Sequence, residues 1–230
     1  MVADLSSQAA IRQLVADFKR EHQRLNVLVN NAGVNVKRRT LTAEGLELNF
    51  AVNYLAPFLL TRLLIDILKV SAPARVINVA SAAEQMGRID FDDLMSTRGY
   101  SALRAYSQSK LAMVLFSYEL ARRIAQSKVT VNCLHPGVIR TKITQGMSGW
   151  GAVIALLGRP FAASPERGAE TILYLASSPR VEGGTGKYFE NKREKKSSSR
   201  SYDVAAGERL WQISEQLTDS PPERISSVAC

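Results

Sequence analysis

Three short apolar runs constrain the fold of this chain more than any other feature of its sequence. They cover residues 25–30, 74–80 and 128–134, and each is followed by polar or glycine-containing residues. Runs this short and this apolar are typical of strands buried on both faces. Segments with helical periodicity separate them, and strands that alternate with helices predict an α/β fold with a parallel sheet.

Helices are expected between and around these strands. Apolar residues recur at helical spacing after candidate N-caps at Ser6 and Ser7, within residues 42–70, and over 102–126, 165–177 and 203–217. Pro57 is expected to mark either a kink or a helix start. A last short strand is expected at residues 187–189.

Composition narrows the class of protein. The 230 residues are 46% hydrophobic and 22% charged, which is typical of a globular chain and predicts one domain over residues 1–230. Cys133 and Cys230 are too few for a disulfide scaffold, and His22 and His135 are too far apart for a metal site. Charged residues interrupt the apolar stretch 51–70, and no signal peptide is recognised, so we expect a soluble, cytoplasmic protein.

The net charge of +9 is unevenly distributed. Residues 187–200 hold six basic and two acidic side chains, which gives +4 in this part alone. Within it, residues 191–201 form a basic, serine-rich segment that we expect to be a solvated surface loop. The alternative, a patch that binds nucleic acid or an anionic membrane surface, stays open at this stage.

Polar or small residues follow each of the three predicted strands, at 30–33, 78–81 and 135–137. Ligands of open parallel sheets bind beyond the carboxyl ends of the strands, so these segments are expected to line a cleft. Ser81 ends the second strand and could hydrogen-bond a substrate oxygen there. Asn53 is a polar residue within a predicted buried helix.

Tyr106 and Lys110 are the strongest candidates for chemistry. At positions i and i+4 of a predicted helix, they project from the same face. A fixed ammonium beside a phenol favours the phenolate, so the pair predicts a lowered pKa for Tyr106. Such a tyrosine can act as a general acid or base toward a carbonyl or hydroxyl group.

Taken in order, the sequences NNAG at 30–33, Asn53, Ser81, YxxxK at 106–110 and PGxxxT at 136–141 resemble the short-chain dehydrogenase/reductase family. The sequence HPGVIRT at 135–141 is similar to the retinol-dehydrogenase branch. The resemblance implies a Rossmann-type, doubly wound parallel sheet and an oxidoreductase that interconverts an alcohol and a carbonyl with NAD(P)(H). It slightly favours NADP over NAD.

The resemblance also implies roles for single residues. Tyr106 would be the general acid/base, Lys110 would lower its pKa and hold the nicotinamide ribose, Ser81 would fix the substrate oxygen, and Asn53 would hold a relay water. The other cofactor contacts implied are Asp4, Asn31, Ala32, Gly33, Pro136, Gly137, Val138 and Thr141. No metal and no nucleic acid are implied. The family often pairs through the helices that carry Asn53 and Tyr106, so a homo-oligomer is expected.

One departure from the family pattern bears on the function. No glycine-rich phosphate-binding turn occurs in these 230 residues, and such a turn normally begins a nucleotide-binding sheet. We therefore expect an N-terminally truncated domain that binds the cofactor poorly. A catalytically silent fragment and a basic binding protein are the alternatives to an enzyme.

The apolar residues 150–162 raise a further expectation. They read either as an ordinary packed helix or as a lid over the substrate. As a lid, they would favour an apolar substrate or a peripheral contact with a membrane.

Overall fold

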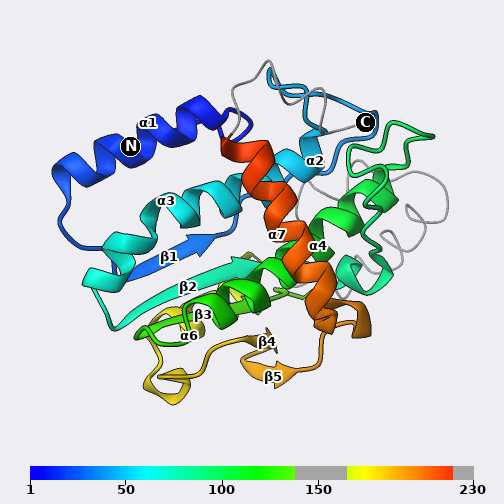
Figure 1. The fold of residues 1–230 in the computed structure, drawn as a ribbon. Helices are drawn as coiled ribbons and strands as arrows, with labels where there is room; N and C mark the ends of the chain where they lie inside the picture. The colour runs from blue at the N-terminus through cyan, green and yellow to red at the C-terminus, as the bar shows by residue number, and fades with distance from the viewer. Residues whose placement is uncertain (138–164, 220–230) are drawn as a thin grey trace.

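A computed structural model of the chain describes residues 1–137 and 165–219 (Figure 1). Its main elements are α1 (Gln8–Glu21), β1 (Val27–Asn30), α2 (Leu48–Phe50), α3 (Ala56–Val70), β2 (Ala74–Val79), α4 (Ala102–Arg123), β3 (Val129–Leu134), α6 (Pro165–Ser177), β4 (Lys187–Glu190), β5 (Arg193–Lys195) and α7 (Val204–Asp219). A π-helical turn, η1 (Ala51–Leu55), joins α2 to α3. Short 3-10 turns lie at η2 (Ala82–Met86), η5 (Pro179–Val181) and η6 (Ser199–Tyr202).

The strands form one five-stranded sheet in the order β1-β2-β3-β4-β5. Its first four strands are parallel, which confirms the predicted α/β class, and β5 is antiparallel to β4. Sequence periodicity missed β5 because all of its three residues are charged and exposed. Charged side chains of this kind are common on edge strands, where they discourage pairing with other chains.

Helices cover both faces of the sheet (Figure 1). Helices α3 and α4 lie on one face, α6 lies on the other, and α7 runs across α4. The aromatic ring of Trp211 on α7 lies 5.0 Å from that of Phe58 on α3 and 5.9 Å from that of Phe116 on α4, measured between ring centres. Apolar burial between these helices and the sheet makes the main core.

A helix was expected within residues 42–70, and in the structure it begins at Leu48. The Glu47 carboxylate caps it, accepting from the backbone N–H groups of Asn49 and Phe50 at 3.0 and 2.9 Å. Pro57 lies in the first turn of α3, directly after the π-helical turn η1. It therefore falls within a continuous helical stretch and neither starts nor breaks it. The stretch Leu48–Val70 is apolar and long enough to cross a membrane, with a mean hydropathy of 1.5. However, 67% of it is buried in the fold, as in the core helix of a soluble protein.

A buried polar ladder joins the carboxyl ends of β1 and β2 to the helices above them. The Asn30 amide donates to Thr61 Oγ1 at 3.0 Å and to Asn78 Oδ1 at 2.7 Å. The Asn78 amide in turn donates to Ser117 Oγ on α4 at 2.8 Å. Satisfied buried networks of this kind hold elements in one arrangement, so this edge of the sheet is a rigid base for a site.

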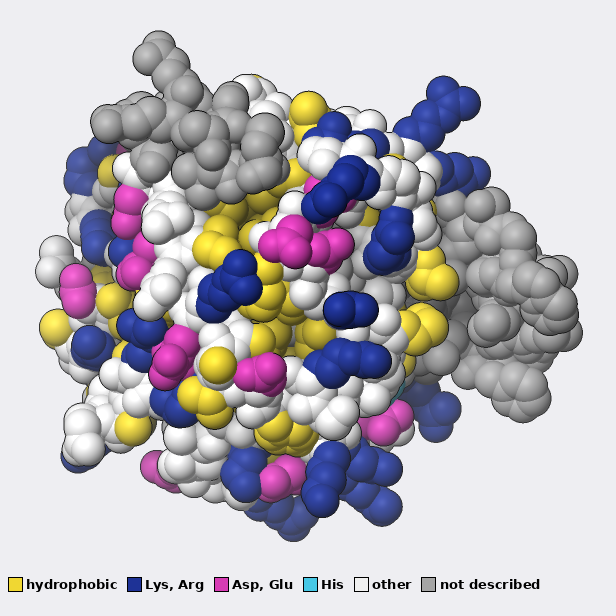
Figure 2. Space-filling model, turned by 45° about the vertical axis from the view of Figure 1, so that its right-hand side comes forward, with side chains coloured by type: hydrophobic (Ala, Val, Ile, Leu, Met, Phe, Trp, Pro, Cys, Tyr) yellow, Lys and Arg dark blue, Asp and Glu magenta, His cyan; other side chains and the backbone are white. Residues whose placement is uncertain are grey.

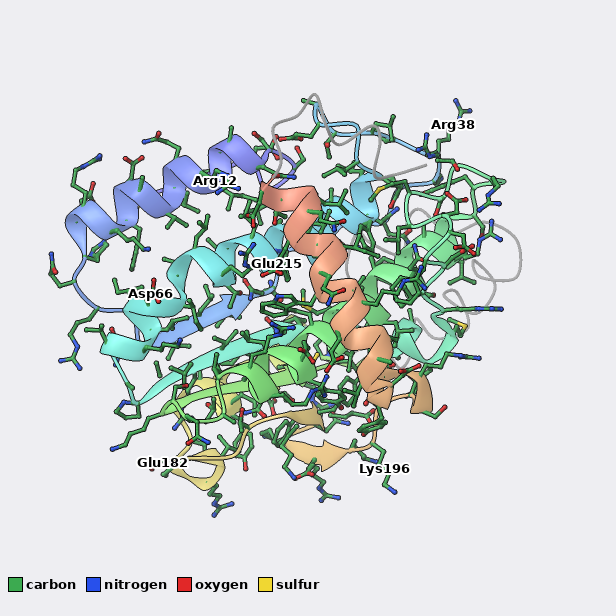
Figure 3. All side chains as sticks on the ribbon, in the orientation of Figure 1. Arg12, Arg38, Asp66, Glu182, Lys196 and Glu215 are labelled. Atoms are coloured by element: carbon green, nitrogen blue, oxygen red, sulfur yellow. The ribbon has the colours of Figure 1, made fainter. Side chains whose placement is uncertain are left out.

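The basic, serine-rich segment 191–201 differs in part from the expected surface loop. Its cations are exposed, and Lys196 points away from the fold (Figure 3). Lys192 pairs with Glu170 at 2.7 Å, so part of the positive charge is compensated. Its serines Ser197, Ser198 and Ser201 are buried, which corrects the surface assignment for these residues.

Candidate active site

Tyr106 and Lys110 lie on the face of α4 that is turned toward the sheet. Both are nearly buried, with 9% and 3% of their surface exposed. The Lys110 ammonium lies 5.8 Å from the centre of the Tyr106 ring and donates to the Val79 carbonyl oxygen at 3.1 Å. The predicted pair is therefore assembled at the carboxyl end of β2, where a parallel sheet binds its ligands.

The electrostatics of Tyr106 differ from the sequence-based expectation. Burial raises the pKa of its phenol, and a hydrogen bond from Ser81 opposes that rise. Sequence spacing predicted a pKa lowered by Lys110, but removal from water outweighs any effect of the ammonium in this structure. Tyr106 is therefore a protonated phenol at neutral pH, able to donate a proton.

Lys110 shows the opposite shift. Burial lowers the pKa of its ammonium from 10.5 to about 8. This follows from desolvation, which disfavours the charged form of a lysine. At neutral pH the group still carries a proton, and that charge lies beside the phenol.

Ser81 is brought to Tyr106 by the turn that follows β2. It is the N-cap of η2, and its hydroxyl accepts from the Ala83 N–H at 3.3 Å. The Ser81 side chain also lies close enough to Tyr106 to oppose the rise in the pKa of the phenol. The predicted serine and tyrosine thus share one site although 25 positions separate them in the sequence.

Asn53 occupies the π-helical turn η1 and is fully buried. Its amide donates to the Val34 carbonyl at 2.9 Å and to Ser109 Oγ at 2.9 Å, and its Oδ1 accepts from Val34 N–H at 2.7 Å. π-Helical turns are rare and often occur at functional sites. The side chain therefore holds the backbone at Val34, and the relay water expected beside Asn53 stays a prediction.

Ser109 is a site residue that sequence reasoning missed. Its hydroxyl accepts from Asn53 and donates to the Tyr106 backbone carbonyl at 2.7 Å. The available signal was its place between Tyr106 and Lys110, on a helix whose residues 105–121 are all buried. A small polar residue in such a helix needs a partner, and Asn53 supplies it.

Gly33 leaves room in front of the lysine. A Cβ atom at this position would lie 3.3 Å from Asn53 Oδ1 and 3.4 Å from Lys110 Nζ. Asn31 and Ala32 are exposed beside it, at the end of β1. Absence of a side chain lets a ligand approach the backbone closely, and at Gly33 such a ligand would lie near the Lys110 ammonium.

The carboxyl end of β3 lies beside that of β2, because the two strands are parallel neighbours in the sheet. His135 Nδ1 accepts from the Gly137 N–H at 3.0 Å, and its Nε2 lies 3.2 Å from the Glu190 carboxylate. Gly137, which follows Pro136 in the chain, has a φ of 85°, a conformation that favours glycine. Val138, Thr141 and the predicted lid at 150–162 lie outside the described residues.

Asp4 lies before α1 and belongs to no strand. Its carboxylate accepts from the Ser6 N–H and hydroxyl at 2.9 and 2.8 Å, and these bonds lower its pKa. The contact with adenine that the resemblance implies stays a prediction. Within residues 1–137 and 165–219, no group of three or more His, Cys, Asp or Glu side chains is placed to hold a metal ion.

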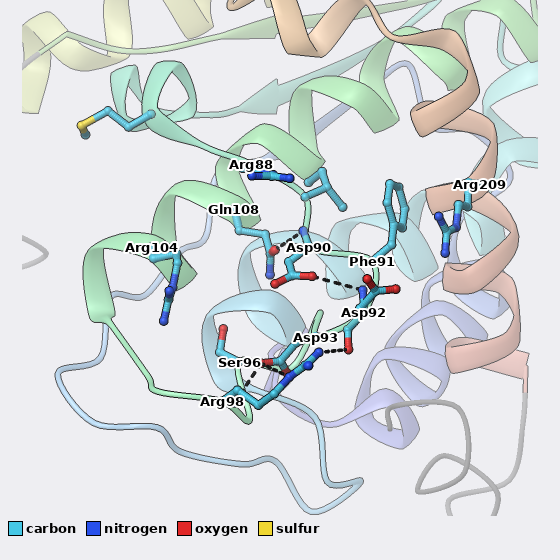
Figure 4. Close-up of a pocket in the computed structure, with 12 residues that line it drawn as sticks. Arg88, Asp90, Phe91, Asp92, Asp93, Ser96, Arg98, Arg104, Gln108 and Arg209 are labelled. Carbon is cyan, nitrogen blue, oxygen red and sulfur yellow. Dashed lines mark hydrogen bonds and ion pairs between the residues drawn. The ribbon is translucent and has the colours of Figure 1, made fainter.

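A separate cavity of about 560 Å³ lies on another side of α4 (Figure 4). Gln108 faces it, accepting from Asp90 N–H at 2.8 Å and donating to the Leu94 carbonyl at 3.0 Å. None of the residues assigned from the sequence lines this cavity. Around this side of the molecule, cations and carboxylates are interspersed rather than gathered by sign (Figure 2).

Comparison with known proteins gives consistent matches along the chain. A family model described as short chain dehydrogenase matches residues 1–151. Mouse retinol dehydrogenase 14 is 43% identical over 222 residues, and human retinol dehydrogenase 13 is 44% identical over 220; each match covers 93% of this chain. Human polyprenol dehydrogenase is 41% identical over 226 residues, 95% of this chain and 68% of its own. The chain spans 65% of the mouse protein and 66% of human retinol dehydrogenase 13.

Solved structures agree with these matches. A putative uncharacterized protein from Mycobacterium paratuberculosis superposes with a TM-score of 0.73 at 30% identity, over 95% of this chain and 74% of that one. The Pseudomonas aeruginosa RhlG/NADP active-site complex superposes with a TM-score of 0.62 at 28% identity, over 82% of this chain and 73% of that one. The parallel sheet and its flanking helices are therefore shared with these solved structures.

Proposed function

Because the chain belongs to the short-chain dehydrogenase family, we propose that it is an oxidoreductase that interconverts an alcohol and a carbonyl with a nicotinamide cofactor. The observation that carries this proposal is the arrangement of Ser81, Tyr106 and Lys110 at the carboxyl end of β2. A phenol, a hydroxyl donor and a buried ammonium meet there, and these are the groups that proton transfer to a carbonyl oxygen requires.

In the direction of reduction, Tyr106 donates its proton to the carbonyl oxygen, and Ser81 hydrogen-bonds the same oxygen. In the direction of oxidation, Tyr106 accepts the hydroxyl proton. The adjacent Lys110 charge stabilises the phenolate that forms in between. Asn53 and Ser109 hold the backbone on both sides of the pair, so that the donors are positioned before the substrate arrives.

A nicotinamide cofactor, when bound, supplies or accepts the hydride, and the protein manages the proton. Lys110 and the open backbone at Gly33 would hold its ribose end. Asp4, Asn31, Ala32, Pro136, Gly137, Val138 and Thr141 remain the proposed further contacts. NADP is proposed over NAD, and the likeness to a solved NADP complex supports that preference.

The proposed substrate is an apolar alcohol or its aldehyde. The names of the similar proteins, retinol dehydrogenase and polyprenol dehydrogenase, support an isoprenoid-like chain. The apolar residues 150–162, which lie outside the described residues, are proposed to cover it, with a peripheral membrane contact as the route for such a substrate.

Helix α7 bears on the proposed homo-oligomer. Trp211 packs on Phe58 of α3 and Phe116 of α4, so α7 occupies the face of these helices through which pairing was expected. We therefore propose that any pairing of this chain uses another surface. Sedimentation of the intact chain tests whether it pairs. A dimer cross-linked through residues of α3 or α4 would contradict the proposal that another surface is used.

A substrate series tests the proposed function. The purified chain is mixed with NADP(H) or NAD(H) and primary alcohols or aldehydes of increasing chain length, and nicotinamide absorbance is followed. Longer chains are expected to give higher kcat/KM, because each buried methylene contributes about 0.8 kcal/mol, a few-fold in binding. Calorimetric titration with the same cofactors first establishes whether the chain binds them. No turnover by a chain saturated with cofactor would count against the enzyme, and a flat response to chain length would count against the apolar site.

A further inference from the structure

A buried carboxylate with no role in the proposed chemistry lies one turn beyond Ser81. Glu84 belongs to η2 and is fully buried. Its Oε1 accepts from the Ser198 N–H at 3.1 Å and from the Gln85 amide at 2.7 Å, and its Oε2 accepts from Ser198 Oγ at 2.6 Å. Charge-assisted hydrogen bonds of this length are among the stronger ones in proteins.

No lysine or arginine of the described residues pairs with Glu84 within 4.0 Å. Burial accordingly raises the pKa of its carboxyl, and the bonds from Ser198 oppose that rise. The nearby His135 also opposes that rise, but only the hydrogen bonds hold the carboxylate in one place, and a buried carboxylate that loses such bonds is destabilising. Ser198 is therefore the partner on which the position of Glu84 depends.

Ser198 is itself anchored to α4. Its carbonyl accepts from Ser201 Oγ at 2.7 Å, Ser201 Oγ lies 2.7 Å from Ser197 Oγ, and Ser197 Oγ lies 2.6 Å from the Tyr118 hydroxyl on α4. These serines come from the basic segment that the function did not use. They form a continuous buried chain of hydrogen bonds from α4 to Glu84.

The far end of η2 is pressed against the same helix. A Cβ atom at Gly87 would lie 2.6 Å from the Ser107 carbonyl oxygen and 2.7 Å from Leu111 Cβ, so this backbone packs directly on α4. Arg200 Nη1 lies 3.3 Å from the Gly87 carbonyl oxygen. The turn is thus held from the segment 197–201 on one side and by α4, beside Tyr106, on the other.

We propose that Glu84 is a positioning residue, which holds Ser81 in hydrogen-bond reach of Tyr106, and that Ser198 is its anchor. Ser81 and Glu84 are joined by a single turn, because the Glu84 N–H donates to the Ser81 carbonyl at 3.0 Å. A displacement of Glu84 therefore moves Ser81 as well. This inference rests on the proposed roles of Ser81 and Tyr106 in catalysis.

The experiment reads the Ser81–Tyr106 hydrogen bond without turnover. Tyrosine is labelled at Cζ with an NMR-active isotope, and the Tyr106 resonance is assigned by Tyr106→Phe. Ser81→Ala defines the shift caused by losing the bond. We expect Glu84→Ala and Ser198→Ala to shift the resonance in the same direction. Glu84→Gln, which keeps the shape and can still pair with Ser198, should restore most of the wild-type position.

Ser199→Ala is the matched control, since Ser199 is exposed in the same segment; it should leave the resonance in place. Backbone amides of residues 82–87 should exchange about tenfold or more faster in Glu84→Ala, as expected for loss of hydrogen bonds to a charged acceptor. Ser198→Ala removes the Oγ bond and keeps the backbone bond to Glu84, so its shift should be smaller than that of Glu84→Ala. If Glu84→Ala does not fold, Glu84→Asp, whose shorter side chain withdraws the carboxylate from both Ser198 donors, decides. A Tyr106 resonance unmoved by the Glu84 variant would overturn the proposal, whether or not the chain shows dehydrogenase activity.

Discussion

Lys110 lies one helical turn beyond Tyr106 on α4, with its ammonium 5.8 Å from the centre of the phenol ring and bonded to the Val79 carbonyl. The bond to Val79 fixes the ammonium at the end of β2. Burial acts on both side chains in opposite senses, lowering the pKa of Lys110 and raising that of Tyr106. The charge of the pair is therefore sensitive to anything that changes access of water.

The lowered pKa of Lys110 predicts a change of stability with pH. Between the folded pKa of about 8 and the unfolded value of 10.5, the unfolded chain binds one more proton than the folded chain, so stability rises with pH in this window. Between about pH 7.5 and about pH 9.5, the free energy of unfolding measured with urea should rise by about 2 kcal/mol more in wild type than in Lys110→Met. Lys69→Met, at an exposed lysine, should keep the wild-type dependence of the free energy of unfolding on pH. If Lys110→Met keeps that dependence as well, the buried Lys110 is not its cause.

Gly33→Ala tests whether a ligand approaches the backbone at Gly33. The added methyl group would press on Asn53 and Lys110, so we expect weaker cofactor binding, measured by calorimetric titration. Gly184→Ala is the matched control, because its Cβ would meet the Val181 carbonyl at the same 3.3 Å but far from the site along the chain. Equal effects of the two variants on cofactor affinity would argue against a ligand at Gly33.

Trp211→Ala tests how α7 is held. The ring packs between Phe58 and Phe116, and the Arg123 guanidinium lies 4.3 Å from its centre. Loss of a buried aromatic side chain costs about 3–5 kcal/mol, so the unfolding midpoint should fall sharply. Val204→Ala, at an exposed position of the same helix, should change stability by no more than about 0.5 kcal/mol. Similar midpoints for both variants would mean that α7 is not part of the cooperative core.

Most of the regular elements could be predicted, because their signals are local. Apolar runs located β1, β2 and β3, and the periodic stripe around Leu210 and Leu217 located α7. The strand β5 could not be predicted, because its sequence has no apolar alternation. It is a strand only because it pairs with β4. Local patterns report burial and period, but not which segments meet.

The sequence pointed to part of the candidate site, but it missed Ser109 and the direction of the pKa shift of Tyr106. Motif order led to Ser81, Tyr106 and Lys110, and the structure brings them together. Burial reversed the expected direction of the pKa shift of Tyr106, and burial depends on the whole fold. Contacts such as Glu84 with Ser198, which lie 114 positions apart, leave no local signal in a single sequence.

Replacement of the Tyr106 hydroxyl tests whether this side chain transfers the proton. Turnover of an apolar aldehyde with NADPH is measured for wild type and Tyr106→Phe at saturating cofactor, with Tyr174→Phe on α6 as the control. We expect a loss of about 10²–10⁴-fold in kcat for Tyr106→Phe, as for removal of a general acid, with the cofactor dissociation constant unchanged. A Tyr106→Phe rate within about threefold of wild type, or no difference from Tyr174→Phe, would contradict it.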